Sequence, residues 1–138
     1  MPILEAGIPI NARSSTVWDV ITDAGNYIVW DSGITEIHGD IRNGGTIRIR
    51  TTSANRRYRL GVEQISGEVM TLTRALPRGL FKSVRTFTIS HQDAMTHLRV
   101  QEEFTGPLAG LMGTTAQNTE YSFTEYVTAV RKRAELIG

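Results

Sequence analysis

The sequence predicts a single α+β domain in which a curved antiparallel sheet wraps around one long C-terminal helix. Three observations support this class. Six strand-like runs separated by short turn signals occupy the centre of the chain, one more strand-like run precedes them, and a long stretch of helical periodicity closes the chain. A chain of 138 residues is the size of one domain and can bury a core without disulfides. We therefore expect one domain over residues 1–138.

The N-terminal elements are short. Residues 4–10 alternate apolar and other side chains, which predicts the first strand. A helix follows, for which Thr16 and Asp19 have capping-box spacing, while Ser14 or Ser15 could equally provide the cap. Residues 26–30 then indicate a second short helix or a turn.

The remaining strands come from the centre of the chain. Closely spaced strands with short turns pair as consecutive hairpins, so we expect a largely antiparallel meander. The six runs are residues 34–41, 46–53, 57–65, 69–76, 84–90 and 96–104.

The C-terminal segment, residues 108–137, contains no proline and carries one apolar stripe. Residues that recur every three or four positions mark one face of a helix, and a helix of this kind depends on packing that face against the sheet. The stripe consists of Ala116, Thr119, Phe123, Val127, Val130, Ala134 and Ile137.

Composition excludes several classes of function. The net charge of +1, from 15 basic and 14 acidic residues, gives no electrostatic case for a nucleic-acid partner, and the arginines within residues 48–59 are interpreted as a solvated sheet face. No apolar stretch approaches the roughly 20 residues that cross a bilayer. No basic segment followed by an apolar run opens the chain, so we expect a cytoplasmic protein without stable membrane insertion.

Metal and cofactor chemistry finds no support in the sequence. There is no cysteine, and the histidines at positions 38, 91 and 97 lack the spacing of metal ligands. No phosphate-cradling glycine loop or nucleophile-elbow motif occurs. We expect neither a metal nor a cofactor.

One pair of charged residues stands out from this background. A turn centred on residues 93–94 sets the register of the last two strands, and side-chain alternation then places the paired residues on the inward face. An unpaired buried charge is very costly, so Arg85 and Glu102 should neutralise each other. They are either a polar anchor that orients a ligand oxygen or polarises a carbonyl, or a structural ion pair near the open end of the sheet. The expected pairs are Ile89 with Leu98, Phe87 with Val100, and Arg85 with Glu102.

Most of the other candidate pocket residues can be interpreted in two ways. Phe104 shares the concave face with the charged pair. Trp30, beside Tyr27, either covers one mouth of a cavity or belongs to the core. Flexible side chains at the start of the long helix suit either a pocket gate or ordinary packing. These are Leu108, Leu111, Met112 and Thr115, near Gly110 and Gly113.

Motifs distributed over essentially the whole chain indicate a known family. They are Ile10-Asn11-Ala12 before residues 17–23, Tyr27 with Trp30-Asp31, the Gly45 turn, residues 85–89 with 102–108, and the tail at 123–126 and 131–135. Together they resemble the START-like superfamily, also called SRPBCC, which includes the Bet v 1-like pollen allergens and the polyketide cyclase/dehydrase group. Members often carry a proline after the position of Ala12 and a tryptophan before the sixth strand, where this chain has Arg13 and Leu80-Phe81.

The resemblance implies a helix-grip fold, in which a seven-stranded antiparallel sheet grips the C-terminal helix around a hydrophobic cavity. The wall residues that it implies are Trp30, Phe81, Phe104, Leu108, Leu111 and Met112. Because of the two departures, the identity of the ligand is not carried over.

Fold does not determine function, and three hypotheses remain. The first is binding or transport of a small hydrophobic molecule such as a lipid or polyketide. The second is a polyketide aromatase/cyclase, in which the Arg85–Glu102 pair acts with Tyr27 or Tyr58. The third is a protein-binding module like the Hsp90-activator relatives. Whether the protein is an enzyme stays open, and we expect a monomer or a weak homodimer.

Overall fold

The structure is a computed structural model of the chain. It describes residues 3–23, 34–39, 41–51, 54–75, 77–92, 94–107 and 116–137. Within these ranges the side chains are described except at residues 3–4, 34–35, 51, 54–58, 77, 92 and 116–123.

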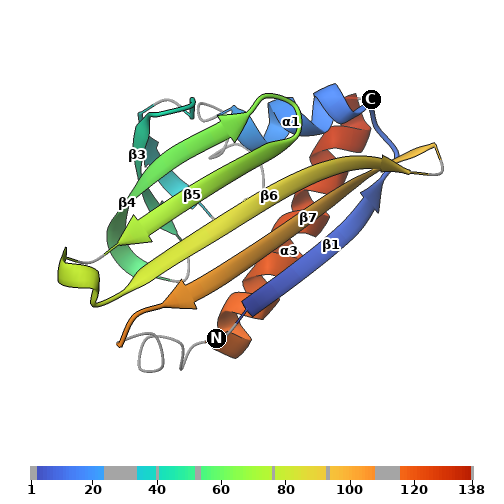
Figure 1. Ribbon diagram of the computed structural model, residues 1–138. Helices are drawn as coiled ribbons and strands as arrows, with labels where there is room; N and C mark the ends of the chain where they lie inside the picture. Colours follow the sequence, from blue (N-terminus) through green and yellow to red (C-terminus); the bar gives the residue numbers. More distant parts are fainter. Residues whose placement is uncertain are drawn as a thin grey trace.

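The described chain forms one antiparallel sheet and two α-helices, which confirms the predicted α+β class (Figure 1). The seven strands lie in the order β1-β7-β6-β5-β4-β3-β2, so the first strand closes the meander next to the last. The elements are β1 Ile3–Ile10, α1 Ser14–Thr22, β2 Ile34–His38, β3 Thr46–Thr51, β4 Ala54–Ile65, β5 Val69–Ala75, the 3-10 segment η2 Pro77–Gly79, β6 Lys82–Gln92, β7 Met95–Thr105 and α3 Ala116–Ile137.

The sheet curves around α3, which crosses the concave side closest to β1, while α1 covers the end near the C-terminus (Figure 1). The direction of α3 follows from two contacts. Glu135, near its end, accepts a hydrogen bond at Oε2 from the backbone N–H of Asn11, which follows β1. Earlier in the helix, Tyr126 packs against Phe87 in the middle of β6. The start of α3 therefore lies toward the opposite end of the sheet, where β6 begins and β7 ends.

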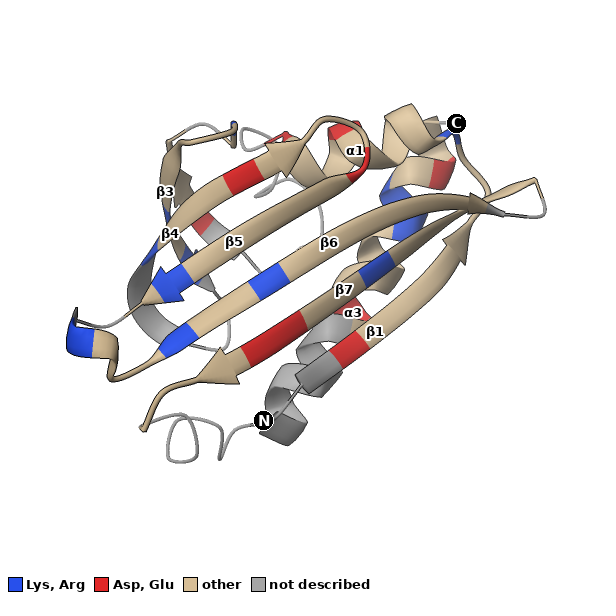
Figure 2. Cartoon of the chain, in the orientation of Figure 1, with Lys and Arg blue, Asp and Glu red and all other residues tan. Residues whose placement is uncertain are grey.

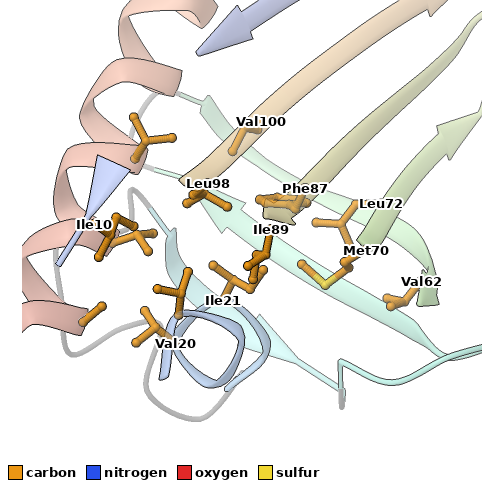
Figure 3. Packing of buried hydrophobic residues seen from close by; sticks show 14 of the residues in the cluster. Ile10, Val20, Ile21, Val62, Met70, Leu72, Phe87, Ile89, Leu98 and Val100 are labelled. Atoms are coloured by element: carbon orange, nitrogen blue, oxygen red, sulfur yellow. The ribbon is translucent and has the colours of Figure 1, made fainter. Parts of the chain in front are cut away.

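The register between β6 and β7 agrees with the sequence prediction. Ile89 lies opposite Leu98, Phe87 opposite Val100, and Arg85 opposite Glu102, with no bulge between them. Because successive side chains on a strand alternate between faces, these six residues share the inner face. The apolar members are buried in the core (Figure 3).

The core lies between the inner face of the sheet and the two helices. Met70 and Leu98 contribute from the sheet and Ile21 from α1 (Figure 3). Val130 of α3 belongs to the same cluster. The predicted helical stripe is buried at Val127, Val130 and Ala134. Ile137 departs from it with 59% exposure, because the last residue of α3 extends past the surface on which the stripe packs.

The predicted cap of α1 is wrong. Arg13 is the N-cap residue, with extended backbone angles and no side-chain capping hydrogen bond, and Ser14 and Ser15 already belong to the helix. Thr16 also belongs to the helix and is buried with its apolar face. The connection from β1 to α1 is held differently: the hydroxyl of Thr96 donates a hydrogen bond of 2.6 Å to the carbonyl oxygen of Ala12.

The outer face of the sheet carries arginines, as predicted. Arg48 on β3 lies directly opposite Arg59 on β4, and both are exposed. The side chains of residues 56 and 57, also part of that prediction, lie outside the described ones. None of the described helices is long and apolar enough to cross a membrane.

Candidate functional site

The Arg85–Glu102 pair forms on the inner face, at the end of the sheet where β6 begins and β7 ends. Nη2 of Arg85 lies 3.1 Å from Oε1 and 3.3 Å from Oε2 of Glu102, so one nitrogen bridges both carboxylate oxygens. Cross-strand register positions the pair, because the two residues are direct partners in the β6–β7 ladder. The Glu102 side chain is only 8% exposed, whereas that of Arg85 is 36% exposed. The carboxylate is buried and its guanidinium partner reaches water.

An aromatic cluster lies beside this pair. The ring centroids of Phe81 and Phe104 are 6.1 Å apart, and Phe81 is buried. Arg74 from β5 places its guanidinium carbon 5.8 Å from the centroid of the Phe81 ring, within the range of a cation–π contact. Arg74 lies on the same face as Met70 and Leu72, which are buried in the core.

The charged pair marks the boundary of the apolar interior. In the next inward-facing row toward the middle of the sheet, Phe87 and Val100 are buried. Tyr126 of α3 meets the Phe87 ring edge-on at a centroid distance of 5.8 Å. In the next inward-facing row toward the start of β6, Ser83 lies opposite Phe104, and both side chains are only partly buried. The inner face thus changes from apolar to polar at the row that holds Arg85 and Glu102.

The structure brings together half of the predicted site residues. Phe81, Phe87, Val100 and Glu102 are buried, and Arg85 and Phe104 are partly buried on the same face. The other predictions fall on residues outside the described part of the chain. They are Tyr27, Trp30, Leu108, Leu111, Met112 and Thr115.

Two residues of this region were not predicted from the sequence. Arg74 could have been found, because it continues the alternation of the buried residues Met70 and Leu72 in β5. Tyr126 could not, because its contact with Phe87 depends on how α3 is rotated and shifted along the sheet. Periodicity identifies the face of a helix but not its position along its partner.

The arrangement can hold and orient a polar group at the edge of an apolar surface. Arg85 supplies N–H donors and a positive charge, and Glu102 supplies a carboxylate that accepts hydrogen bonds or a proton. Among the described residues, no group of histidine, aspartate and glutamate side chains could hold a metal ion. Two open hollows lie elsewhere: one of about 240 Å³ between α1 and the end of α3, and one of about 430 Å³ on the outer face over Gly7.

The fold recurs in proteins of known structure. The chain superposes with a TM-score of 0.80 at 10% identity on StfQ, a di-domain ARO/CYC from the steffimycin biosynthetic pathway, covering 98% of this chain and 51% of that one. The Aha1 dimer from Colwellia psychrerythraea gives a TM-score of 0.78 at 15% identity, covering 99% and 98% of the two chains. TTHA0849 from Thermus thermophilus gives 0.76 at 15% identity, covering 99% of each. At such identities the likeness establishes a shared fold.

Sequence comparison establishes the family. No curated protein matches the chain. A family model described as polyketide cyclase / dehydrase and lipid transport matches residues 1–135, which is nearly the whole chain. This protein therefore belongs to the polyketide cyclase / dehydrase and lipid transport family.

Proposed function

We propose that this protein binds a small apolar molecule between the inner face of the sheet and α3, with the Arg85–Glu102 pair as its polar anchor. The observation that carries the proposal is the position of that pair. A buried carboxylate bridged by a partly exposed guanidinium lies where the apolar interior ends, beside the Phe81–Phe104 cluster. A ligand with an apolar body and an oxygen at one end matches this change in polarity.

The wall of the proposed site combines described and undescribed residues. On the sheet, Phe81, Phe87, Val100 and Phe104 would contact the apolar body of the ligand. From the sequence alone, Tyr27 and Trp30 and the start of the long helix at Leu108, Leu111, Met112 and Thr115 would complete it. The family description, which includes lipid transport, supports a ligand of this kind.

Native mass spectrometry of protein purified from its own host tests the proposal, followed by release and identification of any bound compound. We expect an apolar compound in stoichiometric amount. As a variant test, Leu111→Trp should abolish uptake of an apolar fluorescent probe and leave the circular dichroism spectrum unchanged. A clean apo mass together with no probe uptake by the unmodified protein would contradict the proposal.

The likeness to the di-domain ARO/CYC StfQ favours a second candidate, an enzyme that closes rings in polyketides. In that case Glu102 would accept a proton from a carbon between two carbonyl groups, and Arg85 would stabilise the resulting enolate oxygen. The enolate carbon then attacks a second carbonyl, and loss of water completes the ring. The released compound would distinguish the candidates, because a cyclised product is lighter than its linear precursor by one water.

A further inference from the structure

We propose that the ligand is an anionic amphiphile, whose carboxylate or phosphate group is held by a cationic rim formed by Arg74, Arg78, Lys82 and Arg85. This inference rests on the proposed binding function and adds the charge and the orientation of the ligand. The apolar body would lie against the inner face, with the anionic group at the end of the sheet where β5 passes through η2 into β6.

The four cations gather at one end of the sheet. Ala75, the last residue of β5, lies opposite Lys82, the first residue of β6, which in turn lies opposite Thr105, the last residue of β7. Arg74, Arg78 and Lys82 therefore lie at the same end of the sheet as Arg85, Glu102 and Phe104. Figure 2 shows lysine and arginine concentrated where β5 passes into β6.

Acidic residues do not balance this end of the described sheet. Residues 72–86 contain the four cations and no carboxylate, and the adjoining end of β7 contributes Glu102 and Glu103. Glu102 is bound to Arg85. Glu103 lies opposite Val84 on the outer face, the face on which Lys82 also lies, so this end of the described sheet carries four cations and two carboxylates. In the described structure neither Arg78 nor Lys82 forms an ion pair, and both are exposed.

The inner-face members of the rim lie against apolar and aromatic surface. The guanidinium of Arg74 lies over the Phe81 ring, and Arg85 is next to Phe87 along the inner face of β6. A guanidinium is more weakly hydrated than an ammonium and binds carboxylate or phosphate with paired N–H groups, so it suits a site that is wet on one side and apolar on the other. The start of α3 lies toward this end as well, and the positive end of its helix dipole adds to the field.

The experiment compares two fluorescent probes that differ only in charge, cis-parinaric acid and its methyl ester. We expect the acid to bind about tenfold more tightly than the ester at low ionic strength, which corresponds to one charge-assisted hydrogen bond, and salt to reduce the difference. The double variant Arg78→Gln/Lys82→Gln and the single variant Arg74→Gln should remove most of this preference while affinity for the ester is retained.

The matched control is Arg48→Gln/Arg59→Gln, which removes the same number of charges from the exposed outer face of β3 and β4. It should leave the preference for the acid unchanged. Competition by dodecanoate and by dodecyl phosphate then tells which anionic group the rim prefers. Equal affinity of the unmodified protein for acid and ester, or equal losses in rim and control variants, would overturn this inference while leaving the proposed function intact. If neither probe bound, the proposed function itself would fail.

Discussion

Glu102 lies deeper in the protein than Arg85, the residue to which it is bound. The Glu102 side chain is 8% exposed and that of Arg85 is 36% exposed, although Nη2 and Oε1 are only 3.1 Å apart. A buried carboxylate is costly without a counter-charge, whereas a guanidinium with access to water is not. Glu102 therefore depends on the pair more than Arg85 does.

The first prediction is that Glu102→Ala lowers the free energy of unfolding by about 1–2 kcal/mol, whereas Glu63→Ala changes it by less than about 0.5 kcal/mol. Glu63 is the control because it is an exposed carboxylate on β4, which β5 separates from β6 and the charged pair. Urea denaturation followed by circular dichroism measures both.

The asymmetry of the pair gives a second comparison. Arg85→Ala should cost more than Glu102→Ala, about 3 kcal/mol, because it leaves the buried carboxylate without its partner. Equal effects of Glu102→Ala and Glu63→Ala would show that the pair contributes nothing to stability.

The register that creates this pair was predictable from the sequence, and the contacts between elements were not. The apolar alternation around Phe87 and Val100 fixes which residues of β6 and β7 share a face, and a slip of one position would expose the apolar set. The hydrogen bond from Thr96 to Ala12 joins residues 84 positions apart. Periodicity within each segment contains no information about such a contact, because it depends on how β1, α1 and β7 meet.

The start of α1 shows a different limit. Ser14, Ser15 and Thr16 are all good capping residues, so composition favoured a cap among them. In the structure the helix begins at Ser14, and Thr16 and Val17 are both buried on its apolar face. The cap preference, worth about 1 kcal/mol, is small beside the burial of this face and does not set the helix boundary.

The third prediction concerns Gly106, where β7 leaves the sheet. Its φ is +99°, and a Cβ at this position would lie 2.7 Å from the carbonyl oxygen of Leu80. Gly106→Ala should therefore lower the free energy of unfolding by about 3 kcal/mol, from backbone strain and from the clash together. Gly67→Ala is the matched control, because φ is +79° and nothing lies within 4 Å of the added Cβ. It should cost only about 1–2 kcal/mol.

The urea denaturation midpoints of the two glycine variants compare their stabilities, provided that the unfolding free energy falls with urea at the same slope in both. Because Leu80 precedes Phe81, Gly106→Ala should also disturb the Phe81–Phe104 cluster and weaken probe binding. A Gly106→Ala variant as stable as Gly67→Ala would mean that the two segments are not in close contact.

The fourth prediction concerns Thr96, whose side chain is fully buried and donates a 2.6 Å hydrogen bond to the carbonyl oxygen of Ala12. Thr96→Val keeps the shape and removes the donor, so we expect a loss of about 1–3 kcal/mol. Thr128→Val provides the control, because that hydroxyl bonds the carbonyl oxygen of Thr124 at an exposed position on α3. A smaller effect for Thr96→Val than for Thr128→Val would show that the buried hydrogen bond does not hold β7 to the β1–α1 connection.

The last prediction is a pH dependence from the outer face. Nη2 of Arg99 on β7 lies 2.8 Å from Oε2 of Glu5 on β1. The hydrogen bond from Arg99 lowers the pKa of the Glu5 carboxyl below its ordinary value of 4.5. Desolvation opposes this change, and the positive charge of Arg99 adds a smaller lowering of the pKa. A carboxyl whose pKa is lower in the folded state binds fewer protons there, so its contribution to stability is present above the ordinary pKa. That contribution disappears as the pH falls through the lowered pKa.

Glu5→Gln removes this titration, so the difference in stability between it and the unmodified protein should be largest at neutral pH and vanish in acid. Both side chains are about half exposed, so the difference should be small and should shrink with added salt. In an Arg99→Gln background, Glu5→Gln should have no further pH-dependent effect, which isolates the pair in a double-mutant cycle. Thermal unfolding of the four proteins across pH measures the effect. A difference that persists unchanged into acid would assign it to the loss of side-chain packing rather than to the charge of Glu5.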